Sequence, residues 1–318
     1  MKILVTGGTG FIGSHTANFL HKKGHDVTIC DNNFRGKFDD SVKHLNFIQC
    51  DLTKIDELEK LDTDYDCVYH FAAINGTGNF YEIPHLVLKV NALANINILD
   101  WCVKNKIKKI LSTSSSEVYA STPNKSIPTK EEVSVSIDNI YNPRFSYAAS
   151  KIFGESLFLN YHTQFDLEVK IVRPHNIYGA RMGFEHVIPQ VIKRIYKKES
   201  PFKIYGHDQS RSFCYIDDAV RLLELVMDKK ASDGKIIHLG TEVETKIDDL
   251  VYKLFDICDF HPEVEFSDPV IGSVSRRCPD VSLLSEITGY RSKCDLDYGL
   301  RESCKWYLDY YRKQEILD

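Results

Sequence analysis

The chain has 318 residues and a net charge of −5, and 43 % of its residues are hydrophobic. These values are typical of a globular protein that is long enough for one large domain or for two lobes. A negatively charged chain lacks the broad basic surface that binds nucleic acid, and no apolar run approaches the about 20 residues of a membrane span. We therefore expect neither nucleic acid nor a membrane as a partner.

The N-terminus and the cysteines favour a cytoplasmic protein. The chain begins directly with a predicted strand, "MKILVTGG", which leaves no room for a signal peptide. Nine cysteines are scattered singly, without a CxxC pair. This pattern favours reduced thiols over a secreted disulfide framework or a zinc site, so we expect no bound metal.

Short apolar runs alternate with stretches of helical periodicity through the first two-thirds of the chain. We predict strands at 2–6, 27–30, 46–50, 67–71, 109–112 and 167–172, and helices at 13–23, 54–61, 86–105 and 147–164. Alternation of this kind predicts an α/β fold, with a Rossmann-type doubly wound parallel sheet that helices cover on both faces.

The pattern changes after residue 174. Helices are predicted at 186–198, 218–229, 246–258 and 298–313, with short extended pieces at 202–205 and 235–239. We expect a first domain over 1–174, to which the chain returns near 213–242, and a smaller α/β C-terminal lobe mainly within 175–318.

A glycine motif lies between the first predicted strand and helix. Gly7, Gly10 and Gly13 in "TGGTGFIG" allow a tight turn and let a diphosphate approach the helix N-terminus. Asp31 ends the second strand, 18 residues after Gly13, at the separation expected of an acid that binds a ribose diol. Because this carboxylate repels a 2′-phosphate, the motif predicts NAD rather than NADP.

Two further segments belong to the same edge of the sheet. Asp51 follows the third strand, where it contacts the cofactor or caps the next helix. The "FAA" segment, residues 71–73, ends the fourth strand with small side chains, as a backbone that lies against a cofactor requires.

A catalytic constellation is predicted downstream. Tyr147 and Lys151 are four residues apart and therefore project from one face of a helix. An ammonium near a tyrosine lowers the pKa of the phenol, which then accepts a hydroxyl proton during hydride transfer. Ser115, in "STSSSEVYA" at 112–120, can bind the same hydroxyl. We interpret this serine-rich stretch as an active-site wall.

Together these motifs resemble the extended short-chain dehydrogenase/reductases of the nucleotide-sugar epimerase/dehydratase group. The resemblance covers nearly the whole chain and rests on "TGGTGFIG", "FAA", "STSSSEVYA", "YAASK", "RPHNIYG", "RSFCYIDDA" and "RRCPD".

The resemblance implies a role for each matching position. The implied catalytic residues are Tyr147, Lys151, Ser115 and Glu117. The implied NAD contacts are Gly7, Gly10, Phe11, Ile12, Gly13, Asp31, Asn32, Asp51, Leu52, Phe71, Ala72, Ala73, Asn91, Tyr147, Lys151 and Pro174. The implied contacts to the nucleotide-sugar substrate are Asn75, Ser116, Asn176, His186, Val187, Arg211, Arg277 and Asp280.

The motifs leave the net reaction open. The resemblance implies oxidation of the sugar at C4, followed by epimerisation as the first expectation. The alternatives are 4,6-dehydration with Glu117 as the base at C5, decarboxylation of a nucleotide-linked uronic acid, and a non-catalytic NAD sensor. The resemblance also implies a homodimer formed through the predicted helices at 86–105 and 147–164.

Overall fold

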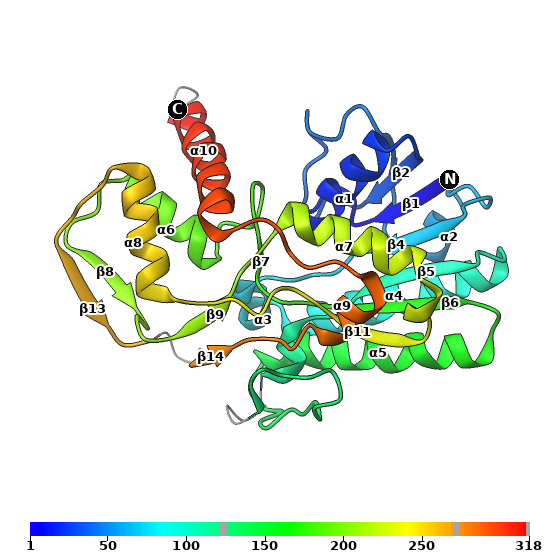
Figure 1. The fold of residues 1–318 in the computed structure, drawn as a ribbon. Coiled ribbons are helices and arrows are strands. Elements are labelled where there is room, and N and C mark those ends of the chain that lie inside the picture. The colour runs from blue at the N-terminus through cyan, green and yellow to red at the C-terminus, as the bar shows by residue number, and fades with distance from the viewer. Residues whose placement is uncertain (121–125, 270–273, 316–318) are drawn as a thin grey trace.

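The computed structural model describes residues 1–120, 126–269 and 274–315. Its centre is a seven-stranded parallel sheet with the strand order β11-β6-β5-β4-β1-β2-β3 (Figure 1). The strands are β1 (Lys2–Thr6), β2 (Asp26–Asp31), β3 (Asn46–Gln49), β4 (Cys67–His70), β5 (Lys109–Thr113), β6 (Glu168–Pro174) and β11 (Lys235–Leu239). The predicted Rossmann-type fold is confirmed, and the chain returns to the sheet through β11, which pairs with β6.

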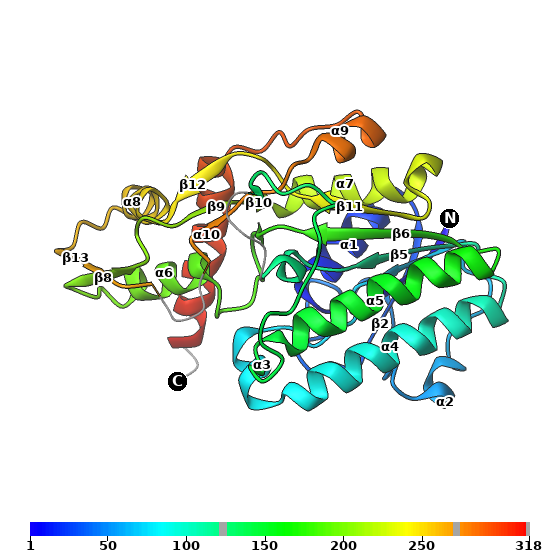
Figure 2. The same ribbon diagram turned by 90° about the horizontal axis from the view of Figure 1, so that it is seen from below.

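Helices cover both faces of this sheet. One face packs against α1 (Phe11–Lys22) and α7 (Ile216–Asp228), and the other against α2 (Ile55–Leu58), α4 (Pro84–Lys104) and α5 (Phe145–Gln164) (Figure 2). Alternate residues of a strand point to opposite faces. Ile3 and Val5 of β1 accordingly belong to the core on the α1 side, and Leu4 belongs to the core on the α4 side.

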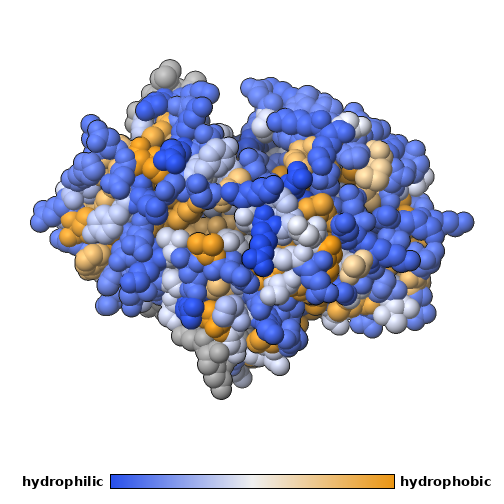
Figure 3. Space-filling model, viewed as in Figure 1, coloured by the Kyte–Doolittle hydropathy of each residue, from blue (hydrophilic) through white to orange (hydrophobic). Residues whose placement is uncertain are grey.

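The smaller lobe lies at the carboxyl ends of the sheet strands. It contains α6 (Val187–Tyr196), α8 (Ile247–Cys258), α10 (Leu296–Glu315) and the parallel pair β8 (Phe202–Tyr205) and β13 (Val264–Ser267). Short strands connect it to the sheet: β7 (Ile177–Tyr178), β10 (Cys214–Tyr215), β9 (Ser210–Ser212), β12 (Glu244–Lys246) and β14 (Arg276–Arg277). A notch separates the two lobes at the top of the view in Figure 3.

Two helices were not predicted, namely α3 (Thr77–Glu82) and α9 (Ser282–Thr288). Both are too short to show a clear helical period in the sequence. One helix, α4, is long and apolar enough to span a membrane by length and composition, but half of its most apolar window is buried inside the protein. The core helix of a globular protein can have the same length, composition and burial.

Candidate active site

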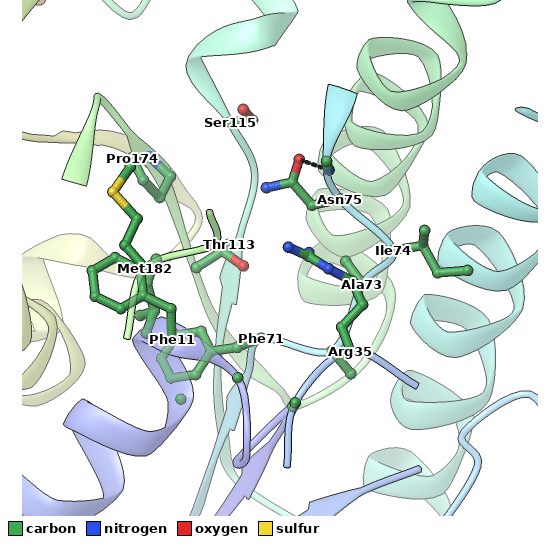
Figure 4. Close-up of a pocket in the computed structure, with 18 of the residues that line it drawn as sticks. Phe11, Arg35, Phe71, Ala73, Ile74, Asn75, Thr113, Ser115, Pro174 and Met182 are labelled. Atoms are coloured by element: carbon green, nitrogen blue, oxygen red, sulfur yellow. Dashed lines mark hydrogen bonds between the residues drawn. The ribbon is translucent and has the colours of Figure 1, made fainter. Parts of the chain in front are cut away.

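A cleft of about 690 Å³ lies between the two lobes. Its floor is formed by the glycine turn after β1 and by the carboxyl ends of β4 and β5, and the smaller lobe forms the opposite wall (Figure 4). Parallel α/β sheets bind their ligands at this edge. The cleft therefore occupies the position that the sequence motifs indicate.

The glycine turn leaves space that any side chain would fill. Gly7 adopts a φ of +67°, and a Cβ there would lie 2.7 Å from the Ala72 nitrogen. A Cβ on Gly13 would lie 2.1 Å from the Gly7 oxygen. Helix α1 begins at Phe11, and Gly10 at its N-cap has no side chain to accept from the first helical N–H groups. The residues that carry those donors, Phe11, Ile12 and Gly13, line the cleft, and such a helix start fits the diphosphate of NAD.

Acidic residues stand at the carboxyl ends of the next two strands, with Asp31 as the last residue of β2 and Asp51 two residues after β3. The Asp31 carboxylate accepts hydrogen bonds from the Thr9 amide at 3.1 Å and from the Asn33 amide at 2.8 Å. A carboxylate has about four lone-pair positions, so Asp31 keeps acceptors for a ribose diol. Asp51 lines the cleft and also accepts from the Thr53 amide and hydroxyl at 3.0 and 2.8 Å. Asp51 thus stands at the cleft and fixes a local turn at the same time.

Tyr147 and Lys151 project from α5 into the cleft. Tyr147 is buried and stacks on Phe80 with a centroid distance of 5.0 Å. The Lys151 ammonium donates to the Thr113 carbonyl at 2.8 Å and lies 5.5 Å from the centre of the Tyr147 ring. These contacts place a cation beside the phenol, as the i, i+4 spacing predicts.

Burial shifts both of these groups toward their neutral forms. It lowers the pKa of Lys151 to about 8 and raises the pKa of Tyr147, while the Ser115 hydroxyl opposes the shift at Tyr147. The positive charge of an oxidised nicotinamide acts in the opposite direction on a nearby phenol. The chain therefore holds a Tyr–Lys–Ser arrangement that can remove the proton of a sugar hydroxyl once the cofactor is bound.

Glu117 is held by arginines. Its carboxylate accepts from Arg277 at 2.6 Å and lies 3.7 Å from Arg144. The charge of Arg277 is the main cause that lowers the pKa of Glu117, and Arg144 and Arg211 act in the same direction. Arg277 and Arg144 thus flank an ionised Glu117 at this end of the cleft.

Most of the site residues that the sequence indicates line this one cleft. They are Gly7, Gly10, Phe11, Ile12, Gly13, Asp31, Asn32, Asp51, Leu52, Phe71, Ala72, Ala73, Asn75, Ser115, Ser116, Glu117, Tyr147, Lys151, Pro174, Asn176, His186, Val187 and Arg277.

Three of the indicated residues do not line the cleft. Asn91 is buried behind its wall, where its side chain bonds the backbone of Ile74 and the Ser150 hydroxyl. Arg211 donates to backbone carbonyls such as Val274 at 2.6 Å. The Asp280 carboxylate accepts from the amide of Ser282, the first residue of α9, at 2.8 Å. In this structure their side chains therefore organise neighbouring backbone.

Arg144 and Arg35 also line the cleft, although the sequence motifs assigned them no role. Arg144 lies three residues before Tyr147, in "NPRFSY", and Arg35 lies four residues after Asp31, in "NNFRGK". Both sit close in sequence to residues that the motifs do identify, and this proximity is the signal that could have found them.

Comparison with known proteins places the chain in a family. The model of the "NAD dependent epimerase/dehydratase family" matches residues 3–240. The chain is 32 % identical to UDP-N-acetyl-alpha-D-glucosaminuronate decarboxylase of Bacillus cytotoxicus, over 97 % of this chain and 98 % of that protein.

Solved structures agree with the family match. A UDP-glucose 4-epimerase of Thermotoga maritima with UDP-glucose has a TM-score of 0.89 at 26 % identity, over 99 % of this chain and 100 % of that one. MoeE5 in complex with UDP-glucuronic acid and NAD has a TM-score of 0.82 at 25 % identity, over 99 % and 100 %. The predicted family, the enzyme class and the NAD cofactor are thereby confirmed, and the chain belongs to the NAD-dependent epimerase/dehydratase family of nucleotide-sugar enzymes.

Proposed function

We propose that the protein is an NAD-dependent decarboxylase of a nucleotide-linked uronic acid. The observation that carries this proposal is the pairing of Glu117 with Arg277 and Arg144 beside Ser115 and Tyr147. The sequence placed epimerisation first and decarboxylation third. The charge arrangement around Glu117 is the reason to reverse this order.

The state of Glu117 disfavours dehydration. A base that removes the C5 proton needs a pKa near the working pH and a free carboxylate oxygen. Glu117 has a lowered pKa and is bound by Arg277, so it is a weak base. An ionised Glu117 instead orients Arg277 at the end of the cleft.

The two arginines at the Glu117 end of the cleft favour a substrate with a carboxylate. Guanidinium groups bind carboxylates through charge-assisted hydrogen bonds, and Arg144 and Arg277 both line the cleft. A relative that decarboxylates a UDP-linked uronate and a structural neighbour that contains UDP-glucuronic acid support this choice.

The chemistry of such a substrate needs no strong base. The bound nicotinamide supplies the acceptor, and later the donor, of the C4 hydride. Tyr147 takes the proton of the C4 hydroxyl, and Ser115 orients that hydroxyl. Oxidation at C4 gives a β-keto acid. In this intermediate the bond from C5 to the carboxylate breaks, and CO₂ leaves. The electron pair stays in the enolate, C5 then takes up a proton, and Tyr147 returns its proton when C4 is reduced.

An isotope experiment tests the proposal. The protein is incubated with NAD in D₂O and, in turn, with UDP-glucuronate, UDP-N-acetylglucosaminuronate, UDP-glucose and dTDP-glucose, and the products are followed by proton NMR. We expect CO₂ and a UDP-pentose with deuterium at C5, without net use of NAD. A changed C4 configuration without deuterium would support epimerisation, and a new methyl group would support dehydration.

We also propose a cytoplasmic homodimer. All nine cysteines are free thiols, as a reducing compartment maintains them. Helices α4 and α5 lie side by side on the outside of the sheet, where Leu88 and Phe153 are each 42 % exposed (Figure 2). Phe158, by contrast, packs inside the protein's own core. Replacement of both Leu88 and Phe153 by Arg should give monomers in sedimentation if these helices form the interface.

A further inference from the structure

The Arg35 side chain reaches from the first domain to the opposite wall of the cleft. A Cβ added to Gly183 would lie 3.6 Å from Arg35 Nη2 and 3.7 Å from His186 Cδ2. Gly183 and His186 belong to the segment that leads into α6 in the smaller lobe. Figure 4 shows the Arg35 side chain extending into the cleft beside Ala73 and Asn75. The guanidinium therefore lies between the lobes, next to a histidine that the resemblance assigns to the substrate.

Arg35 also acts on the catalytic phenol. Burial raises the pKa of Tyr147, and the charge of Arg35 opposes this shift. Desolvation lowers the pKa of Arg35, and Tyr147 and Glu185 oppose that shift in turn. Because the interaction between two charges weakens with distance, the guanidinium and the Tyr147 hydroxyl are neighbours. Arg35 thus faces the part of the cleft where the sugar reacts.

The Arg35 guanidinium is not occupied by the protein itself. Among the residues that the structure describes, it has no hydrogen bond and no ion pair, whereas Arg277 in the same cleft binds Glu117 at 2.6 Å. The carboxylate of Glu185 is turned to the start of α3, where it lies 3.5 Å from the Gly78 amide. A partly desolvated cation without an acceptor is suited to bind an anionic ligand.

The reaction determines where the carboxylate of a uronic acid has to lie. Tyr147 takes the proton of the C4 hydroxyl, and the carboxylate stands on C5, the neighbouring carbon of the same ring. A group that binds this carboxylate therefore has to lie near the Tyr147 hydroxyl. The charge of Arg277 is shared with Glu117, whereas Arg35 meets the requirement and is unpaired in the described part of the chain.

We propose that Arg35 binds the carboxylate of the uronic acid and thereby selects this substrate over the corresponding neutral sugar. A guanidinium can hold a carboxylate through two parallel hydrogen bonds, which a neutral C6 hydroxyl cannot match. Arg35 is thus a specificity-determining residue, and Arg144 and Arg277 position Glu117. This inference rests on the proposed function, because it requires an acidic sugar as the substrate.

Ligand pairs that differ only at C6 test the proposal. The pairs are UDP-glucuronate with UDP-glucose, and UDP-N-acetylglucosaminuronate with UDP-N-acetylglucosamine. Their dissociation constants are measured by calorimetry on the NAD-loaded protein that carries Tyr147→Phe to prevent turnover. Addition of Arg35→Gln should weaken the acidic member of the preferred pair about tenfold, through loss of a charge-assisted hydrogen bond. The affinities for the neutral member and for UDP should be unchanged.

Two variants and one kinetic measurement complete the test. Arg35→Lys keeps the charge and should recover part of the lost affinity. Lys43→Gln is the matched control, because Lys43 is an exposed cation that pairs with Asp40. With Tyr147 intact, Arg35→Gln should raise KM for the uronate with little change in kcat, as loss of uniform binding does. Its unfolding transition should be unchanged, because no described protein group binds this guanidinium.

The outcomes separate this inference from the proposed function. If wild-type protein releases CO₂ from a uronate and Arg35→Gln binds that uronate normally, the inference is wrong and the proposed function stands. Equal weakening of the acidic sugar, the neutral sugar and UDP would also overturn the inference, because Arg35 would then serve the nucleotide. If wild-type protein releases no CO₂ from either uronate, the proposed function itself fails.

Discussion

The Glu117 carboxylate accepts a hydrogen bond from Arg277 Nη1 at 2.6 Å, which joins two residues 160 positions apart. Glu117 follows the serine-rich end of β5, and Arg277 belongs to β14, which runs beside β9. The pair connects the catalytic wall of the sheet to the smaller lobe. It also decides which chemistry Glu117 can perform, because a bound and ionised carboxylate orients its partner.

The variant Glu117→Gln separates positioning from base catalysis. A glutamine still accepts a hydrogen bond from Arg277 but loses the charge, so we expect kcat to fall by about tenfold. A general base would lose a factor of about 10² to 10⁴. The measurement is steady-state decarboxylation of UDP-glucuronate, with exposed Glu132→Gln as the control. A loss of about a hundredfold or more would contradict the positioning role.

The variant Tyr147→Phe tests the hydroxyl that receives the substrate proton. The ring keeps its stacking on Phe80, so the fold and NAD binding should be unchanged. Turnover should fall by at least about 10², because general acid–base catalysis is lost. Single-turnover appearance of reduced nicotinamide is the readout. Tyr141→Phe, at a tyrosine that is 93 % exposed, is the matched control. Normal turnover in Tyr147→Phe would contradict the role of Tyr147 as the proton acceptor.

Lys151 makes the stability of the nucleotide-free protein depend on pH. Burial lowers its pKa from 10.5 to about 8, so the unfolded chain binds more protons between these values. Stability should therefore rise as the pH increases from 8 to 10.5, by about 3 kcal/mol. In Lys151→Met this rise should disappear in urea unfolding experiments, whereas exposed Lys104→Met should keep it. If the free energy of unfolding of the wild-type protein stayed constant from pH 8 to 10.5, the lowered pKa of Lys151 would be contradicted.

Two buried histidines predict loss of stability in acid. The ring centroids of His175 and His238 lie 4.7 Å apart. Burial lowers the pKa of both imidazoles, to about 4 for His238. Below pH 6.5 the unfolded chain binds more protons, so folding becomes less favourable as the pH falls. For His238 alone the loss is about 3 kcal/mol at pH 4. The slope of the free energy of unfolding against pH reports how many more protons the unfolded chain binds. Below pH 6.5, His175→Leu should reduce this number by up to one, and exposed His261→Gln should leave it unchanged.

Local sequence determined the parts of this protein whose geometry depends on neighbouring residues. The strand–glycine–helix order fixed the turn around Gly7 and Gly13, because only glycine allows its backbone to approach so closely. The helical period placed Lys151 beside Tyr147. Alternation of apolar runs and helices predicted the parallel sheet. Each of these features depends on residues that are close together in the sequence, so it can be predicted without knowledge of the fold.

Only the tertiary structure decided the features that depend on contacts between residues far apart in the sequence. The sequence grouped Arg211 and Asp280 with the substrate contacts, and in the folded chain their side chains also bond nearby groups, such as the Val274 carbonyl and the Ser282 amide. No short-range pattern indicates that Arg277 reaches Glu117 or that Arg181 pairs with Asp39, because those pairs form only when the two lobes pack together. The charge state of Glu117 follows from the same packing, since a pKa depends on the distances to charges that are remote in sequence.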